Sequence, residues 1–218
     1  MEVGPDAAGR MDRIYRHQRH IYDVTRRFFL LGRDAALREL QPPRPGAVLE
    51  IGCGTGRNLI AAARRYPQAL FCGIDISNEM LKSCRRSVAR AGLSARIAVA
   101  YGDATDFDPA RLFARVRFER IFISYSLSMI PRWREVLEQA MTKLAPGGEL
   151  HIVDFGGQSG LPRAFRAALR RWLALFHVSP RDDLEEALKA LAAAHGAGLE
   201  LRRPFRDYAQ LAVVKARA

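Results

Sequence analysis

The sequence has little cysteine, little lysine and no long apolar run, and each shortage argues against a class of protein. Its three cysteines are Cys53, Cys72 and Cys84, with no CxxC pair and no His/Cys spacing typical of a metal site. An odd number of scattered cysteines argues against a disulfide framework. It favours reduced thiols in a cytosolic protein without a bound metal.

Long hydrophobic segments are also missing. No apolar run reaches the roughly 18 residues that a membrane-spanning helix needs. The opening stretch, "MEVGPDAAGRMDRIYRHQRH", lacks the apolar centre of a secretory signal, so we expect a cytoplasmic protein. Repeats and low-complexity tracts are absent too. A chain of 218 residues can bury one substantial core, which favours a single globular domain.

Acidic residues are in the minority. The 35 lysines and arginines exceed the 23 aspartates and glutamates, giving a net charge of +12, and 31 of the basic residues are arginine. The pI of about 10.4 predicts attraction to polyanions, either nucleic acid or an anionic membrane face. The positions of the arginines have to decide between these partners.

Short runs rich in β-branched and aromatic residues alternate with helical stretches. Such alternation predicts a parallel, doubly wound sheet. Its strands are expected at 47–52, 70–76, 96–102, 120–126 and 149–155, with the helix before the last one ending at Pro146-Gly147-Gly148. Two helices and two further strands are expected beyond it, at 161–176, 182–195, 199–205 and 208–216. The turn between the last two strands is too short for a crossover helix, so this pair should be antiparallel.

The most informative motif is "VLEIGCGTGRN", which runs from Val48 to Asn58. Gly52, Gly54 and Gly56 stand between an expected strand and an expected helix, where glycine allows a tight turn and lets a ligand lie against the backbone. The dinucleotide-binding pattern GxGxxG would have glycine where Arg57 stands. The motif alone therefore also fits a merely tight strand–helix turn.

Three acids follow the ends of three successive strands: Glu50, Asp75 and Asp103. The carboxyl ends of parallel strands meet at one edge of the sheet, where open α/β folds bind ligands. Three carboxylates suit a pyrophosphate poorly. They suit a ligand with a cationic centre, ribose hydroxyls and an exocyclic amine.

Four motifs, "VLEIGCGTGRN", "GIDIS" followed by Met80, "YGDAT" and "LAPGGEL", resemble the ordered motifs of class I S-adenosylmethionine-dependent methyltransferases over about residues 45–155. The resemblance implies a Rossmann-like seven-stranded sheet, mostly parallel with a C-terminal antiparallel hairpin, and S-adenosylmethionine as the cofactor. It implies that the glycine loop packs under the methionine part and that Asp75 holds the ribose hydroxyls. Asp103 and the Ala104 N–H would bind the adenine. The other expected cofactor contacts are Glu50, Asn58, Ser124 and, flanking the adenine, Ile76 and Met80.

Two amphipathic segments lie outside these motifs. Residues 11–29 repeat apolar side chains at helical spacing with arginines on the remaining faces. The same holds for the helix at 161–176. Its apolar face carries Leu161, Phe165, Leu169, Trp172, Leu173 and Phe176, and its arginines are Arg163, Arg166, Arg170 and Arg171. Each segment is interpreted either as a helix packed on the core or as an interfacial helix that contacts an anionic membrane.

A second resemblance narrows the substrate. "YRHQRHIYDVTRRFFLLGRD", with "SYSLSMIP" after the fourth strand, resembles the bacterial N-methyltransferases that make betaine lipids. It implies three methylations of diacylglyceryl-homoserine to diacylglyceryl-trimethylhomoserine. Phosphatidylethanolamine N-methyltransferases share the core and a YD-containing lead segment, so they remain an alternative. A soluble small-molecule or quinone methyltransferase and a non-catalytic S-adenosylmethionine-binding protein also remain. An RNA methyltransferase is disfavoured because "SYSLSMIP" lacks an (N/D)PP(Y/F) motif.

The acceptor pocket is expected beyond the fourth and fifth strands. Tyr22 and Tyr125 are the predicted catalytic residues, because their hydroxyls and ring faces orient an amine and attract its growing positive charge. Further candidates there are Tyr15, Ser126, Ser128 and Asp154, with Arg26 or Arg27 for an acceptor carboxylate, whereas His151 is expected to be a buried structural residue.

The predicted organisation is one domain over 1–218. A helical lid spans 1–40, the cofactor-binding core spans 45–155, and a helical insert with the terminal hairpin spans 156–218. The expected partners are a lipid substrate and the anionic inner face of a membrane, to which the protein binds peripherally, and no nucleic acid. The sequence is silent on oligomeric state.

Overall fold

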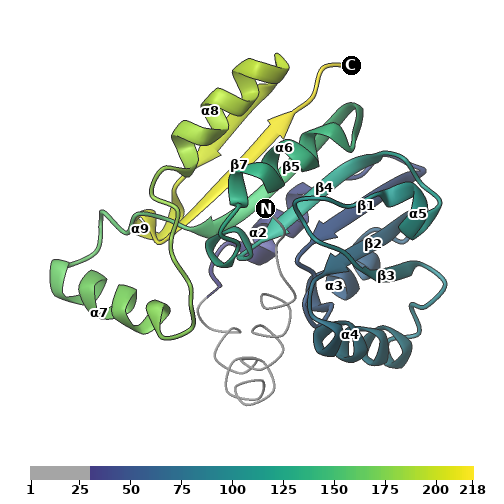
Figure 1. Ribbon diagram of the computed structural model, residues 1–218, viewed down its shortest axis with the longest axis horizontal. Helices are drawn as coiled ribbons and strands as arrows, with labels where there is room; N and C mark the ends of the chain where they lie inside the picture. The colour runs from purple at the N-terminus through teal and green to yellow at the C-terminus, as the bar shows by residue number, and fades with distance from the viewer. Residues whose placement is uncertain (1–29) are drawn as a thin grey trace.

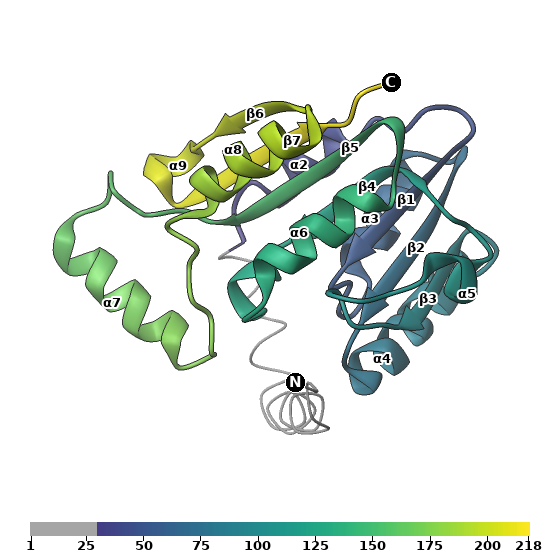
Figure 2. The same cartoon turned by 45° about the horizontal axis from the view of Figure 1, so that its top comes forward.

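The computed structural model describes residues 30–218, in which one seven-stranded sheet is flanked by helices on both faces (Figures 1 and 2). The strand order is β3-β2-β1-β4-β5-β7-β6. The strands span Gly46–Ile51 (β1), Ala69–Asp75 (β2), Ile97–Tyr101 (β3), Phe118–Ser124 (β4), Leu144–Phe155 (β5), Gly198–Arg202 (β6) and Ala209–Lys215 (β7).

The first five strands are parallel, and β7 is antiparallel to both β5 and β6. This confirms the predicted class I methyltransferase fold with its reversed C-terminal hairpin. The order changes direction between β1 and β4, so the crevice of a doubly wound sheet is expected at their carboxyl ends.

Helices cover the sheet in two layers, each around its own apolar cluster. One cluster joins α2, α3 and α4 to Val48, Phe71 and Phe122, and the other joins α6 and α8 to Leu49 and Ile123. The helices span Arg33–Glu39 (α2), Arg57–Arg65 (α3), Asn78–Arg90 (α4), Pro109–Phe113 (α5), Trp133–Thr142 (α6), Arg163–Ala174 (α7), Leu184–His195 (α8) and Pro204–Asp207 (α9), with a 3-10 turn η1 at Leu127–Met129.

Two helix starts follow from local sequence. The Ser77 hydroxyl accepts a hydrogen bond from the Met80 N–H at 3.3 Å, and this N-cap begins α4 directly after β2. The Asp108 carboxylate caps α5 in the same way, with Pro109 in the first helical position, where a missing N–H costs nothing. Both caps fix the loops that leave the carboxyl edge of the sheet.

The structure differs from the predicted strand ends in two places. β5 begins at Leu144, and Pro146-Gly147-Gly148 forms an irregularity within it, because Leu144 pairs with Phe118 before the register shifts. Gly147 has a φ of 67°, which a tight turn of this kind requires. The last hairpin contains the short α9, so β6 ends at Arg202 and does not reach residue 205.

No helix among residues 30–218 is long and apolar enough to cross a bilayer. Most of the predicted lid, including Tyr15, Tyr22, Arg26 and Arg27, lies outside the described residues. Its described end is Leu30 and α2, which pack on the core beside β5 and α3.

Candidate functional site

The glycine loop after β1 has the backbone that its sequence predicts. Gly52, Gly54 and Gly56 have φ values of 74°, 52° and 80°, in the left-handed region that favours glycine. A Cβ on Gly52 would lie 2.7 Å from Ser126 Cβ, and one on Gly56 would lie 2.4 Å from Cys84 Sγ. The N–H of Gly52 donates to the Ile74 carbonyl at 2.9 Å, so the end of β2 anchors the loop.

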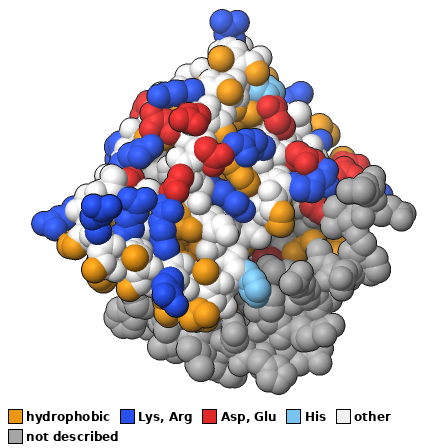
Figure 3. Space-filling view, turned by 60° about the vertical axis from the view of Figure 1, so that its left-hand side comes forward, with side chains coloured by type: hydrophobic (Ala, Val, Ile, Leu, Met, Phe, Trp, Pro, Cys, Tyr) orange, Lys and Arg blue, Asp and Glu red, His pale blue; other side chains and the backbone are white. Residues whose placement is uncertain are grey.

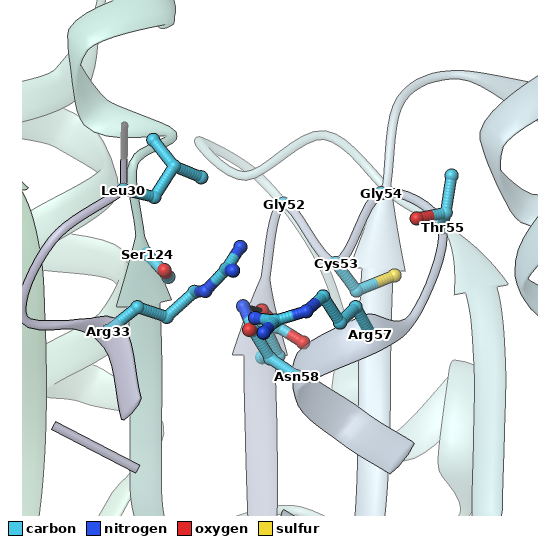
Figure 4. Close-up of a pocket in the computed structure, with 10 residues that line it drawn as sticks. Leu30, Arg33, Gly52, Cys53, Gly54, Thr55, Arg57, Asn58 and Ser124 are labelled. Atoms are coloured by element: carbon cyan, nitrogen blue, oxygen red, sulfur yellow. Dashed lines mark hydrogen bonds between the residues drawn. The ribbon is translucent and has the colours of Figure 1, made fainter. Parts of the chain in front are cut away.

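A pocket of about 380 Å³ opens beside this loop. Figure 4 shows Arg33 entering from α2 on one side and Arg57 and Asn58 entering from the start of α3 on the other. β1, β4 and the glycine loop form the rest of the wall. The lining residues are Leu30, Arg33, Glu50, Gly52, Cys53, Gly54, Thr55, Arg57, Asn58 and Ser124.

Glu50 is the buried acid of the pocket, with 2% of its surface exposed. Asn58 Nδ2 donates to its Oε1 at 2.7 Å, while Oε2 has no hydrogen-bond partner among the described residues. Burial raises the pKa of Glu50 to about 8, and the Asn58 hydrogen bond and the positive charge of Arg33 oppose this rise. The hydroxyl of Ser124 is likewise buried without a partner. Buried polar atoms without partners are rare, and these face a pocket that can hold a polar ligand.

The acids at the ends of β2 and β3 hold their own loops. Asp75 Oδ2 accepts from the Gly54 N–H at 2.8 Å, and Asp75 Oδ1 accepts from the Ser77 N–H at 2.9 Å. Asp103 Oδ1 accepts from the N–H and the hydroxyl of Thr105, at 2.9 and 2.8 Å. Both carboxylates are half-buried, and they sit at the same edge as Glu50 because β3, β2 and β1 are neighbours. Neither lines the pocket.

The predicted adenine contacts lie at this edge as well, outside the pocket lining. Ile76 and Ala104 are half-buried beside Asp75 and Asp103. Met80 is 3% exposed and packs against Met129, which follows β4, and Phe176, which follows α7. The structure thus brings Glu50, Asn58, Ser124 and the glycines together in one pocket. The residues predicted to contact the adenosine sit along the rim formed by β2 and β3.

Tyr125 does not have the position expected of a catalytic residue. Its side chain is 1% exposed, its ring packs edge-on against Phe155 with centroids 4.7 Å apart, and its hydroxyl donates to the Leu31 carbonyl at 2.5 Å. Burial raises the pKa of its phenol well above the ordinary value. The prediction that this ring orients an amine is therefore corrected: the residue ties β4 to the segment before α2.

Among the other predicted acceptor residues that the structure describes, Ser128 and Asp154 are buried and Ser126 is half-buried. The Asp154 carboxylate is fully buried and accepts from the Ser128 N–H at 3.1 Å and from its neighbour's N–H, and burial raises its pKa to about 6. Ser126 Oγ donates to the Ile51 carbonyl at 3.2 Å. His151 is 3% exposed and its Nε2 contacts Glu149 Oε2 at 2.9 Å, which confirms a buried histidine.

Sequence reasoning missed Arg33, the buried cation of the pocket. It is 7% exposed, an unusual state for an arginine, and its guanidinium lies between Leu30 and the glycine loop (Figure 4). The sequence signal for this position is "LGRD": Gly32, with a φ of 80°, begins α2, and Arg33 follows it directly. Arg57 was seen only as a departure from GxGxxG. It lines the same pocket and contacts Asp34 at 3.6 Å.

Comparison with known proteins agrees with this geometry. Residues 48–148 match the family model described as a methyltransferase domain. The chain is 33% identical to nocamycin O-methyltransferase of Saccharothrix syringae over 61% of this chain and 46% of that protein. It is 32% identical to phosphatidylethanolamine N-methyltransferase of Cereibacter sphaeroides over 59% of this chain and 61% of that protein. The chain spans about half the length of the first curated relatives it matches.

A solved structure extends the likeness to the whole sheet. Phosphoethanolamine N-methyltransferase 2 of Haemonchus contortus, in complex with S-adenosyl-L-methionine, superposes with a TM-score of 0.68 at 17% identity, covering 85% of this chain and 52% of that one. The match at residues 48–148 contains the glycine loop, Asp75 and Asp103. Residues 48–148 therefore resemble a methyltransferase domain, and the sheet as a whole has the fold of the class I methyltransferases.

Proposed function

We propose that the chain transfers the methyl group of S-adenosylmethionine to the amine of a lipid headgroup. The observation that carries the cofactor half of this proposal is a buried carboxyl group beside a buried guanidinium, Glu50 and Arg33, which line one pocket and are 2% and 7% exposed. The methionine end of S-adenosylmethionine carries an ammonium and a carboxylate. In the proposal the Glu50 carboxylate accepts hydrogen bonds from the ammonium, and the Arg33 guanidinium donates hydrogen bonds to the carboxylate; both contacts are charge-assisted.

The rest of the pocket fits the same ligand. The glycine loop offers the ligand a backbone without side chains. A side chain at Gly52 is also excluded by packing, because its Cβ would meet Ser126 at 2.7 Å. Asn58 holds the Glu50 carboxylate in place at 2.7 Å, and the hydroxyl of Ser124 supplies a further polar contact inside the pocket. When bound there, the cofactor supplies an electrophilic methyl group on a sulfonium sulfur.

The adenosine would lie along the rim formed by β2 and β3. We assign its ribose to Asp75, and its adenine to Asp103, the Ala104 N–H, Ile76 and Met80. What supports this assignment is the adjacency of β1, β2 and β3, which brings the three acids to one edge. Asp75 accepts hydrogen bonds from two backbone N–H groups, and these hold its carboxylate in a fixed orientation. The carboxylate is therefore preorganised for the ribose hydroxyls.

The chemistry demands little from an acid or a base. Each transfer begins with loss of one proton from the substrate ammonium to solvent; the neutral amine then forms an N–C bond with the methyl carbon, and the S–C bond breaks so that its electron pair remains on sulfur. The amine must be neutral to attack, and a water-poor site disfavours its charged form. The protein's main contribution is to align the amine, the methyl carbon and the sulfur. Tyr22 stays the predicted residue that orients the amine, and it lies outside the described residues.

The acceptor we propose is diacylglyceryl-homoserine, methylated in three steps to diacylglyceryl-trimethylhomoserine. The resemblance of "YRHQRHIYDVTRRFFLLGRD" and "SYSLSMIP" to betaine-lipid enzymes supports this choice. Phosphatidylethanolamine is the second candidate, supported by the 32% identity with the Cereibacter sphaeroides enzyme. Both acceptors are amines at the surface of a bilayer.

The test is to incubate the purified chain with methyl-labelled S-adenosylmethionine and total bacterial lipids, then to identify the labelled species by mass spectrometry. Label on the homoserine lipid is the expected result, and the Glu50→Gln variant serves as the control with weakened cofactor binding. Label on phosphatidylethanolamine would replace the first acceptor with the second. Label confined to quinones, or no label in lipids at all, would contradict the proposal.

A further inference from the structure

Helix α7 has an exposed apolar face that no described residue covers. It follows β5 and stands away from the body of the molecule in both ribbon views (Figures 1 and 2). Leu169 and Leu173 attach it to the core, being 7% and 2% exposed. On its outer side Phe165 is 55% exposed and Leu175, at its C-terminal end, is 71% exposed, with exposed alanines between them. The sequence pattern had placed Phe165 and the two buried leucines on a single face, and the structure divides that face.

The exposed surface of α7 is also basic. Arg163 and Arg171 are exposed, and neither forms an ion pair with another residue of the described chain. Arg170 is different, because it binds Asp182 through two hydrogen bonds of 2.9 and 2.6 Å and so belongs to the fold. No acidic residue occurs between Asp154 and Asp182 in the sequence. Figure 3 shows basic and hydrophobic side chains next to one another on this side of the molecule.

The position of α7 connects this surface to the cofactor site. β5 ends at the carboxyl edge of the sheet, and α7 leaves from that edge. Trp172 of α7 packs edge-on against Phe176 with ring centroids 5.0 Å apart, and Phe176 contacts Met80, the predicted adenine contact on α4. A partner surface bound to α7 would therefore lie next to the carboxyl edge of the sheet, which also carries the glycine loop and the three acids.

We infer that α7 docks the protein on an anionic lipid bilayer. The purpose of this docking rests on the proposed function, whereas the docking itself is tested without any methylation reaction. Phe165 and Leu175 enter the boundary between headgroups and acyl chains, while Arg163 and Arg171 contact the lipid phosphates. An anionic bilayer offers acyl chains to the exposed apolar side chains and phosphates to the exposed arginines, both at one surface. Docking through α7 brings the carboxyl edge of the sheet to the lipids, where a headgroup amine would be methylated.

The test uses vesicles without any amine acceptor, made of phosphatidylcholine alone or with phosphatidylglycerol, and measures co-sedimentation of the full chain. The unmodified chain should bind the anionic vesicles, bind the neutral ones weakly, and lose binding as salt increases. The double variant Arg163→Gln/Arg171→Gln should bind about 25-fold more weakly, since each basic residue near such a surface contributes about fivefold. Phe165→Ser and Leu175→Ser should each cost roughly tenfold.

Matched controls lie on other faces. Arg64→Gln/Arg111→Gln removes two exposed arginines from α3 and α5, and Val116→Ser removes an apolar side chain that is 66% exposed. Both should leave vesicle binding within about twofold of the unmodified chain. Circular dichroism of each variant checks that the fold is retained. Equal losses in the control variants, or undiminished binding in all α7 variants, would overturn the role of α7.

Activity is measured separately, on a lipid amine dispersed in neutral detergent micelles, where docking on an anionic surface is not needed. The α7 variants should keep turnover there while they lose it on vesicles. If the unmodified chain binds vesicles through α7 but methylates no lipid amine in either system, the docking stands and the proposed function fails. If the α7 variants bind vesicles normally and methylation proceeds, the docking fails and the proposed function stands.

Discussion

Exchange of Glu50 for glutamine tests the proposed cofactor pocket, because it removes a proton that cofactor binding should release. In the cofactor-free protein burial raises the pKa of Glu50 to about 8, so its side chain is neutral at mildly acidic pH. Pairing with the ammonium of S-adenosylmethionine stabilises the charged carboxylate. Binding below pH 8 must therefore expel the proton of Glu50. Glutamine retains the oxygen that accepts from Asn58 Nδ2 but has no proton to lose.

The size of the effect follows from the pKa of about 8. At pH 6.5 most of Glu50 is protonated in the free protein, so binding should release close to one proton. Near pH 9 the carboxylate is already charged and releases only about 0.1 proton, whereas the ligand's α-amino group has to take up about 0.9 proton to bind as an ammonium, so binding should show net proton uptake. The ligand's own α-amino group, with a pKa of roughly 7.7–8.0, is mostly charged at pH 6.5 and contributes little there. The glutamine variant should release almost none and should bind about 1.5–3 kcal/mol more weakly.

The assay is isothermal titration calorimetry at pH 6.5 in two buffers with different ionisation enthalpies, since the difference between the two heats counts the protons. The same pKa fixes the sign for stability. A carboxyl group whose folded pKa is raised from 4.5 to about 8 favours the fold at low pH, and this contribution is lost as the pH rises through that window. The glutamine variant should not show this loss. Equal proton release by both proteins would refute the assignment of Glu50 to the ammonium.

Three further substitutions, with Gly92→Ala as the control for the first, probe the loop and the neighbouring strands. Gly52→Ala should abolish cofactor binding and cost at least about 1–3 kcal/mol of stability, because φ is 74° and the Cβ would meet a side chain at 2.7 Å. Gly92→Ala, with a φ of 69° and open space around it, isolates the backbone strain, and equal melting and binding losses in the two variants would refute the steric argument. Tyr125→Phe should lower the free energy of unfolding by about 1 kcal/mol through the lost hydrogen bond, measured by urea denaturation, whereas loss of turnover at unchanged stability would restore its predicted catalytic role. Asp75→Ala should weaken S-adenosylmethionine binding by about 1.5–3 kcal/mol in calorimetry, and an unchanged dissociation constant with the fold intact would remove it from the site.

Much of the fold could be predicted from the sequence, because its signals are local. The alternation of strand and helix patterns indicated the parallel sheet, and the short last turn indicated an antiparallel pair. The glycine loop could be predicted for the same reason, since Gly52, Gly54 and Gly56 reveal a positive φ at each position. The neighbouring positions of Glu50 and Asp75 followed from strand order alone.

The rest depends on packing between distant segments, which a single sequence does not display. Tyr125 had the composition and position of an acceptor residue, yet its hydroxyl reaches Leu31, 94 positions earlier in the chain. Arg33 lies 17 positions before Glu50, and only the packing of α2 beside the sheet places both in one pocket. Periodicity alone did not show which apolar residues of α7 pack on the core, and in the structure Leu169 is buried whereas Phe165 is exposed.

The most direct test of the central claim is a competition in one vesicle. Diacylglyceryl-homoserine, phosphatidylethanolamine and a demethylated quinone are mixed in equal amounts with anionic lipid, S-adenosylmethionine and the purified chain, and the intact mass of each lipid is followed over time. We expect successive additions of one, two and three methyl groups to the homoserine lipid, with little change in the other two. Methylation of the quinone alone, or no mass increase in either amine lipid, would contradict the central claim.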